Sequence, residues 1–312
     1  MATVEEKKKK PMSFARHETF YIRDGWLRKG MKLVEKKGFG FFRQDEAPET
    51  LGMGKNMVQS LRFWLQATRL VEPKKENKIE HELSEYGQIV FDMDTYFEDI
   101  GTLWLIHYNL ATNKELSTTW YWFFNIFNHK EFDEPTFLYW LKNFAIVEGA
   151  KVAESSFKKD FQCFINSYLF ESKLKYHNSP EDNINCPLRN LKLLKNTGLK
   201  TYKMNNVNRN SLHPLIVFYI IKKWQEEFQR PLEITISDLT ESHWKDGIKY
   251  NVSKALSLSY EDVIYYLEEC QELDMLTLSR TAGLDSVMLK DIYSGDVLRK
   301  YYQLVKGGEA CE

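Results

Sequence analysis

The segment from residue 52 to residue 71 constrains the fold most, because an amphipathic helix leads directly into a strand. Apolar or small side chains recur at helical spacing on one side: Met57, Leu61, Trp64, Leu65 and Thr68. Polar side chains follow at i, i+4, i+7 and i+11 on the opposite side: Lys55, Gln59, Arg62 and Gln66. A strand from Val71, a charged turn over 73–78 and a returning strand at 81–83 come next. A helix followed by such a hairpin is typical of a winged-helix unit that binds DNA.

The polar side of this helix has the residue types that contact DNA. Lys55 and Arg62 can reach phosphates or guanine edges, and Asn56 and Gln59 can pair with adenine. Backbone amides around Gly54 can hold a phosphate. The expected wing would contact the flanking backbone through three lysines: Lys74, Lys75 and Lys78. The alternative interpretation is a solvated amphipathic helix followed by an ordinary hairpin.

Charge and cysteine content limit the possible functions. With 43 Lys and Arg against 44 Asp and Glu, the net charge is -1, so any DNA binding must come from local basic patches. Four widely spaced cysteines without a CxxC pair predict reduced thiols rather than a zinc site or disulfides: Cys163, Cys186, Cys270 and Cys311. Neither a membrane span of ~20 apolar residues nor a signal peptide is recognisable, so we expect a cytoplasmic, nucleoid-associated protein without membrane contact.

Periodicity along the chain predicts a mainly α fold with small β wings. Six segments are expected: a disordered basic tail at 1–12, an N-terminal winged helix-turn-helix at 13–94, a helical middle domain at 95–176, an Asn- and Pro-rich connection at 177–210, a C-terminal winged-helix-like unit at 211–305 and a tail at 306–312. In the C-terminal unit, a helix capped by Ser259 precedes a hairpin around 281–283. That helix is acidic, so we expect it to be structural or to bind a partner rather than to read DNA: Glu261, Asp262, Glu268 and Glu269.

Several sequence blocks together resemble one bacterial family. In chain order they are FARHETF at 14–20, GWL at 25–27, GMGKNM at 52–57, EDIGTLWLIH at 98–107, TWYWFFN at 119–125, Lys159–Asp160 with Cys163, and EDNINCPL at 181–188. Over 13–305 they resemble a family first defined as a domain of unknown function, which includes the SspB proteins of DNA phosphorothioation and anti-phage defence systems. The resemblance implies a cysteine desulfurase, a sulfurtransferase and an ATPase as partners. It also implies nicking of one DNA strand.

Nicking requires an activated water and stabilised charge on the scissile phosphate, most often with Mg²⁺ held by carboxylates. The candidate residues form a polar cluster near the start of the chain. Glu18 and Asp24 are candidate ligands for Mg²⁺ or Mn²⁺, with His17 as general base, and no nucleotide or organic cofactor is expected. Arg16 and Arg23 are candidates to bind phosphate. The alternative is that His17 and Glu18 fasten the N-terminal segment to the first domain by buried hydrogen bonds.

Other residues with chemical potential have simpler interpretations. His107 lies on an apolar helical pattern and is expected to be a core histidine. Glu98 and Asp99 precede that helix and complement its N-terminal dipole. For the Lys159–Asp160 pair, the family resemblance is the single indication of a role.

The leading hypothesis is a DNA-binding component of a phosphorothioation and defence system that acts as a metal-dependent nicking endonuclease on double-stranded DNA. A noncatalytic adaptor that recruits the sulfurtransferase and ATPase is one alternative. A transcriptional regulator is another, although the chain is far longer than the ~100 residues that one winged helix needs.

Overall fold

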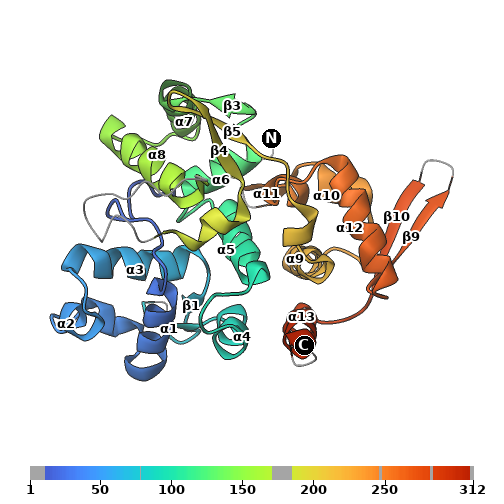
Figure 1. Cartoon of the computed structure of the whole chain (residues 1–312), viewed down its shortest axis with the longest axis horizontal. Coiled ribbons are helices and arrows are strands. Elements are labelled where there is room, and N and C mark those ends of the chain that lie inside the picture. Colours follow the sequence, from blue (N-terminus) through green and yellow to red (C-terminus); the bar gives the residue numbers. More distant parts are fainter. Residues whose placement is uncertain (1–10, 78, 171–184, 246–247, 282–283, 310–312) are drawn as a thin grey trace, which may run out of the picture.

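The computed structural model describes residues 11–77, 79–170, 185–245, 248–281 and 284–309. Within these ranges the protein is mainly helical with small antiparallel sheets, as predicted, and its elements form three groups (Figure 1). Most of the expected basic tail lies outside the described residues. The last helix ends at Glu309 and so extends into the segment expected to be a C-terminal tail.

The first group contains the amphipathic helix and the hairpin predicted over residues 52–83. Its elements are α1 (Trp26–Lys37), η1 (Phe39–Arg43), α2 (Ala47–Leu51), α3 (Lys55–Ala67), β1 (Val71–Pro73), β2 (His81–Leu83) and α4 (Glu85–Met93). Helix α1 crosses α3 closely at Gly30, where an added Cβ would lie 2.8 Å from Leu65 Cδ1. The predicted apolar side of α3 is buried except for Met57, which is half-buried. Ser84 is the N-cap of α4, and its side chain accepts a hydrogen bond from Gly87 N.

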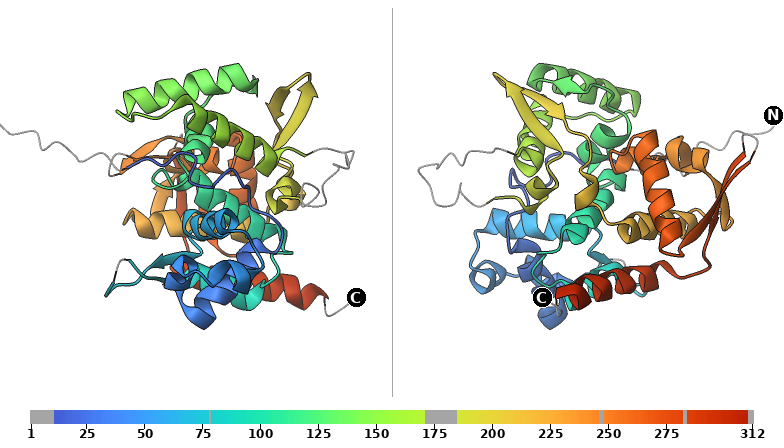
Figure 2. Two further views of the ribbon diagram at one scale, coloured as in Figure 1. Left: turned by 90° about the vertical axis from the view of Figure 1, so that its left-hand side faces the viewer. Right: turned by 45° about the vertical axis from the view of Figure 1, so that its right-hand side comes forward.

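The second group is helical and surrounds α5. It contains α5 (Ile100–Thr112), α6 (Thr118–Asn125), β3 (Glu131–Phe132), α7 (Glu134–Val147), α8 (Glu154–Tyr168), η3 (Pro187–Leu191), β4 (Leu194–Gly198) and β5 (Thr201–Met204). Helix α5 is buried along most of its length. Strand β5 is central in an antiparallel sheet of order β3-β5-β4. Figure 2 shows α7 and α8 at one end of the molecule and α1 at the other, with α5 between them.

The third group repeats the order of helices followed by a hairpin. It contains η4 (Arg209–Ser211), α9 (Pro214–Glu227), β6 (Glu233–Thr235), α10 (Ile236–Thr240), β7 (His243–Lys245), β8 (Ile248–Tyr250), α11 (Val252–Ala255), α12 (Tyr260–Glu272), β9 (Leu276–Thr281), β10 (Leu284–Leu289) and α13 (Ser294–Glu309). The predicted capping box of Ser259 and Asp262 at α12 and the predicted hairpin are both confirmed. Residues 233–235 form β6, which pairs with β10. Thr235 then caps α10.

Long-range contacts join the three groups. The buried hydrophobic residues form one continuous core cluster that includes residues from all three. Tyr301 of α13 donates a hydrogen bond to Asp99, the N-cap of α5. Within the described ranges, none of the helices has the length and apolar character needed to cross a membrane.

Candidate nucleic-acid interface

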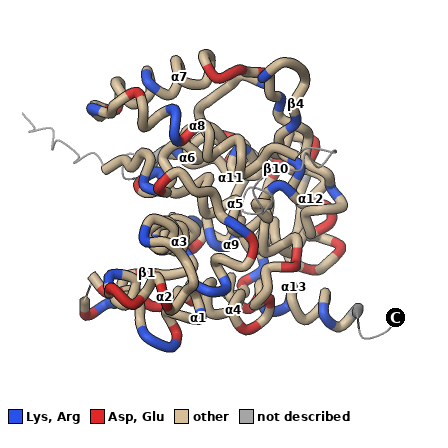
Figure 3. Tube along the Cα trace, turned by 60° about the vertical axis from the view of Figure 1, so that its left-hand side comes forward, with Lys and Arg blue, Asp and Glu red and all other residues tan. Residues whose placement is uncertain are grey.

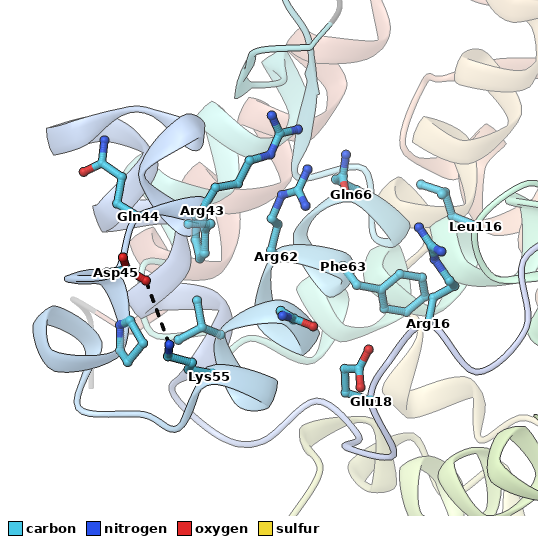
Figure 4. Close-up of a pocket in the computed structure, with 14 residues that line it drawn as sticks. Arg16, Glu18, Arg43, Gln44, Asp45, Lys55, Arg62, Phe63, Gln66 and Leu116 are labelled. Atoms are coloured by element: carbon cyan, nitrogen blue, oxygen red, sulfur yellow. Dashed lines mark ion pairs between the residues drawn. The ribbon is translucent and has the colours of Figure 1, made fainter.

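A cavity of about 550 Å³ opens beside the polar side of α3 (Figure 4). Its wall includes all four residues predicted for that side: Lys55, Gln59, Arg62 and Gln66. Arg16 and Glu18, from the segment before α1, also line it. The last residue of η1 and the loop that follows it add three residues for which the sequence predicted no role: Arg43, Gln44 and Asp45. We call this cavity the arginine pocket.

Three guanidinium groups from separate segments dominate the arginine pocket. In Figure 4, Arg43 and Arg62 extend side by side, and Arg16 lies across the cavity from Arg43. Burial lowers the pKa of Arg62, and the positive charges of Arg43 and Arg16 lower it further, while Glu80 opposes them. Arg62 Nε is also buried without a hydrogen-bond partner among the described residues. An anion between these groups would relieve their repulsion and accept charge-assisted hydrogen bonds.

The positive charge of the arginine pocket is local. Figure 3 shows Lys and Arg interspersed with Asp and Glu across the visible side of the molecule, without one continuous basic face. This pattern agrees with the net charge of -1. Attraction of a polyanion would therefore depend on a few clustered groups and would be sensitive to salt.

His81 of β2 holds the end of the polar side of α3. Its Nδ1 lies 3.3 Å from the Ile79 carbonyl, which can accept but cannot donate, so Nδ1 bears the proton. Its Nε2 then accepts from Gln66 Nε2 at 2.9 Å. Burial is the main cause that lowers the pKa of His81, and the positive charges of Arg62 and Arg43 lower it further. The hydrogen bond to the Ile79 carbonyl acts in the opposite direction and raises the pKa. A neutral His81 thus orients the Gln66 amide without adding charge.

The N-terminus of α3 opens into a second hollow, lined in part by residues 52–57. Gly54 is the N-cap, and no side chain caps the first turn. Lys55 and Asn56 are exposed, and Lys55 makes a loose 3.9 Å ion pair with the fully exposed Asp45. Uncapped amides at a helix N-terminus favour an anion, so this end of α3 extends the positive surface of the arginine pocket.

The β1–β2 hairpin has little positive charge for a predicted DNA contact. Lys74 and Lys75 are exposed, whereas Lys78 lies outside the described residues. The hairpin also contains four glutamates, which outnumber its three lysines: Glu72, Glu76, Glu80 and Glu82. Glu72 lies directly opposite Glu82 across the strands, and like charges in that position repel. The hairpin therefore offers weaker attraction for a phosphate backbone than the arginine pocket does.

The structure separates the residues of the predicted catalytic cluster. Glu18 is half-buried in the wall of the arginine pocket. His17 is 1% exposed, and its Nε2 lies 2.8 Å from Asp160 Oδ1, which matches the buried fastening considered as the alternative. Asp24 is exposed and is not part of the pocket wall. The Arg23 guanidinium lies 5.3 Å from the ring centre of Phe20 and is mostly buried, also away from the pocket wall.

Magnesium or manganese was expected at Glu18 and Asp24, but these side chains are not brought together in the pocket wall. Among the residues that the structure describes, no three His, Cys, Asp or Glu side chains are grouped as a metal site. The arginine pocket contains two carboxylates, Glu18 and Asp45, which Figure 4 shows on opposite sides of the cavity. These residues therefore do not form a metal site by themselves.

The remaining candidates occupy the core. His107 is fully buried beside Tyr168, and burial lowers its pKa to about 3, which confirms a neutral core histidine. Three cysteines are buried and unpaired, and burial raises the pKa of each thiol: Cys163, Cys186 and Cys270. Cys311 lies outside the described residues.

Comparison with known proteins agrees with the resemblance noted in the sequence. Residues 14–302 match the family described as "Protein of unknown function (DUF4007)". The chain belongs to this family. It is also similar to a crystal structure of SspB and to a magnesium-bound crystal structure of SspB, each with a TM-score of 0.81 and 26% sequence identity. The similarity covers 96% of this chain and 91% and 90% of the two SspB chains. The expected SspB-like family is thus confirmed, while no curated protein matches.

Proposed function

We propose that this protein is the DNA-binding component of a bacterial DNA phosphorothioation and defence system, and that the arginine pocket holds a backbone phosphate of double-stranded DNA. The decisive observation is the convergence of three guanidinium groups, from Arg16, Arg43 and Arg62, beside the polar side of α3. Paired guanidinium groups suit phosphate oxygens because they donate several hydrogen bonds in fixed directions. The similarity to SspB supports the proposed system.

In this proposal, α1 to β2 act as a winged helix with α3 in the major groove. The arginine pocket and the uncapped start of α3 bind phosphates and set the register on the duplex. Asn56 and Gln59 are exposed on α3 and contact base edges. Lys74 and Lys75 add weak contacts to the flanking backbone.

Titration of fluorescent duplex DNA over a series of salt concentrations tests this function. We expect log affinity to fall linearly with log salt, by a slope of roughly one for each phosphate contact. Binding that is absent at low salt, or that does not respond to salt, would contradict the proposal. Co-purification with the sulfurtransferase, cysteine desulfurase and ATPase of the system tests the proposed partners.

Metal-dependent nicking of DNA is the second candidate function. It is favoured by the similarity to magnesium-bound SspB and by the position of Glu18 in the same pocket as the three arginines. Mg²⁺ commonly uses one or two carboxylates together with substrate phosphates, so DNA would have to complete its coordination. The arginines would stabilise negative charge on a phosphate held there.

Supercoiled plasmid distinguishes nicking from binding alone. We expect open circles with Mg²⁺ or Mn²⁺ but not with EDTA. Glu18→Ala should abolish nicking, whereas Asp24→Ala, an equivalent change outside the pocket wall, should retain it. His17→Ala needs a parallel check of folding because His17 is buried. Binding without nicking would support the adaptor, and association with a sulfurtransferase or ATPase would then separate the adaptor from a transcriptional regulator.

A further inference from the structure

The segment before α1 is joined to the middle of the molecule by a buried polar contact that the proposed function does not use. We propose that His17 and Asp160 form an anchor that positions Arg16 and Glu18 in the wall of the arginine pocket. This inference rests on the proposed binding of DNA phosphate. Three of the sequence blocks that resemble the family meet here: residues 14–20, residues 119–125 and the Lys159–Asp160 pair. His17 and Asp160 are 143 positions apart in the chain.

Asp160 of α8 is the centre of the anchor. It is 1% exposed and accepts three hydrogen bonds. Its Oδ1 accepts from His17 Nε2 and from Ala15 N, both at 2.8 Å, and its Oδ2 accepts from Thr119 Oγ1 at 2.6 Å. A buried carboxylate is stable only when such donors replace its lost water. The carboxylate therefore ties the N-terminal segment to α6 and α8.

Aromatic rings hold the other side of the anchor. The His17 ring lies nearly parallel to the Trp64 ring of α3, at 10° and 5.9 Å between centroids. Trp120 of α6 meets the His17 ring edge-on. Trp64 Nε1 also donates to the Phe20 carbonyl at 3.0 Å, so the inner side of α3 holds the segment at two points. His17 thus faces inward while its neighbours Arg16 and Glu18 line the pocket.

The backbone around His17 adopts conformations that need external support. Ala15, Glu18 and Thr19 have φ values of 54°, 48° and 68°, in the left-handed region that disfavours residues other than glycine. Such conformations persist when surrounding contacts over-determine them. Without the bonds to Asp160, the segment would relax and Arg16 would leave the arginine pocket. His17 and Asp160 are therefore positioning residues, and Arg16 makes the contact with phosphate.

A double-mutant cycle on the full chain tests this positioning role. Asp160→Asn should weaken duplex affinity about tenfold, the loss expected for one charge-assisted contact. In an Arg16→Ala background, Asp160→Asn should lower duplex affinity less than about twofold, because the contact of Arg16 with phosphate is already missing. In an Arg43→Ala background, Asp160→Asn should still lower duplex affinity about tenfold. Equal, additive losses in both backgrounds would overturn the positioning role.

Trypsin cleavage after Arg16 tests the anchor without DNA. Asp160→Asn should expose this bond and accelerate cleavage, whereas Asp133→Asn, at the N-cap of α7, should not. Unchanged cleavage in Asp160→Asn would overturn the anchor. If Asp160→Asn fails to fold, Thr119→Val provides a milder change because it removes one of the three donors to Asp160. It should also accelerate cleavage and weaken duplex affinity, each to a smaller extent. Absence of DNA binding by the wild type would refute the proposed function, while the trypsin result would still decide the anchor.

Discussion

Two parts of this molecule share an order of elements but differ in the charge that they present. Helices α1 to α3 precede the β1–β2 hairpin, and helices α9 to α12 precede the β9–β10 hairpin. The last helix before the hairpin is basic and polar in the first part, through Lys55, Gln59 and Arg62. In the second part it is acidic, with Glu261 and Glu268 exposed. Element order alone therefore does not indicate a DNA contact; the side chains on the outer face decide.

Part of the acidic charge on α12 has an internal role. Asp262 completes the capping box with Ser259 and forms a 2.8 Å ion pair with Arg209. The Arg209 guanidinium also lies 4.3 Å from the ring centre of Tyr265. Arg62 of the arginine pocket also lies over a ring, 5.2 Å from the centre of Phe39, but the charges of Arg43 and Arg16 repel it. Arg209 instead forms a close ion pair with a carboxylate. Under the proposed function, a bound phosphate would balance the positive charge of the first part, whereas Asp262 already balances Arg209 in the second.

The strongest test of this contrast removes guanidinium groups from each part. The double variant Arg43→Ala/Arg62→Ala should lose roughly a hundredfold in duplex affinity, because two charge-assisted phosphate contacts disappear. Its salt slope should fall by about two. Arg209→Ala, the matched loss on the C-terminal part, should leave both quantities unchanged. A similar loss of affinity in Arg209→Ala would mean that both parts bind DNA.

Stability should show the reverse pattern. Asp262→Ala removes one of the two reciprocal bonds of the capping box and an ion-pair partner, and it should lower the free energy of unfolding by about 1–2 kcal/mol without changing duplex affinity. Chemical denaturation and the DNA titration measure the two effects separately. If the denaturation curve of Asp262→Ala matches that of the wild type, the Asp262 carboxylate does not stabilise the fold as proposed.

The contribution of Asp262 should also depend on pH. Burial tends to raise its pKa, but hydrogen bonds from Arg209 and Ser259 outweigh burial and hold the pKa below its ordinary value of 3.8. A lowered folded-state pKa stabilises the fold above the unfolded-state value, and this stabilisation is lost as pH falls through the folded-state value. The difference in melting temperature between wild type and Asp262→Asn should therefore be constant near neutral pH and shrink below about pH 4. A difference that grows on acidification would contradict this assignment.

A smaller effect is expected at the residues of α3 that are proposed to contact bases. Gln59→Ala should change the preferred DNA sequence more than the overall affinity, with roughly fivefold changes at one base position. Selection of bound duplexes from a random pool would measure the preference. Gln271→Ala, which removes an exposed glutamine side chain from α12, should leave the preferred DNA sequence unchanged. An unaltered preference in Gln59→Ala would exclude this side chain as a reader of sequence.

The smallest effect is expected in the β1–β2 hairpin. Lys75→Glu should weaken binding to all duplexes by about twofold to fivefold, because the neighbouring glutamates already offset the lysines. Lys306→Glu on α13 provides a charge-matched control. A loss as large as that of the arginine double variant would make the hairpin, rather than the arginine pocket, the main electrostatic contact.

The sequence alone determined the features that depend on neighbouring residues. Helical spacing predicted the polar side of α3, and the short pattern Ser259–Asp262 predicted the cap of α12. The ordered blocks predicted the family. Each of these signals spans a few residues or depends on order along the chain, so no knowledge of folding was needed.

The tertiary structure decided which side chains share a site. It joined Arg16 and Arg43 to Arg62, and it enclosed His17 with Asp160. It also removed Arg23 from the candidate site by burying it among aromatic rings. The rings around Arg23 are its sequence neighbours, whereas the arginine pocket and the contact of His17 with Asp160 join residues far apart in the chain, up to 143 positions. Local periodicity provides no signal for such contacts. Long-range packing, not local pattern, set the charge that the arginine pocket presents.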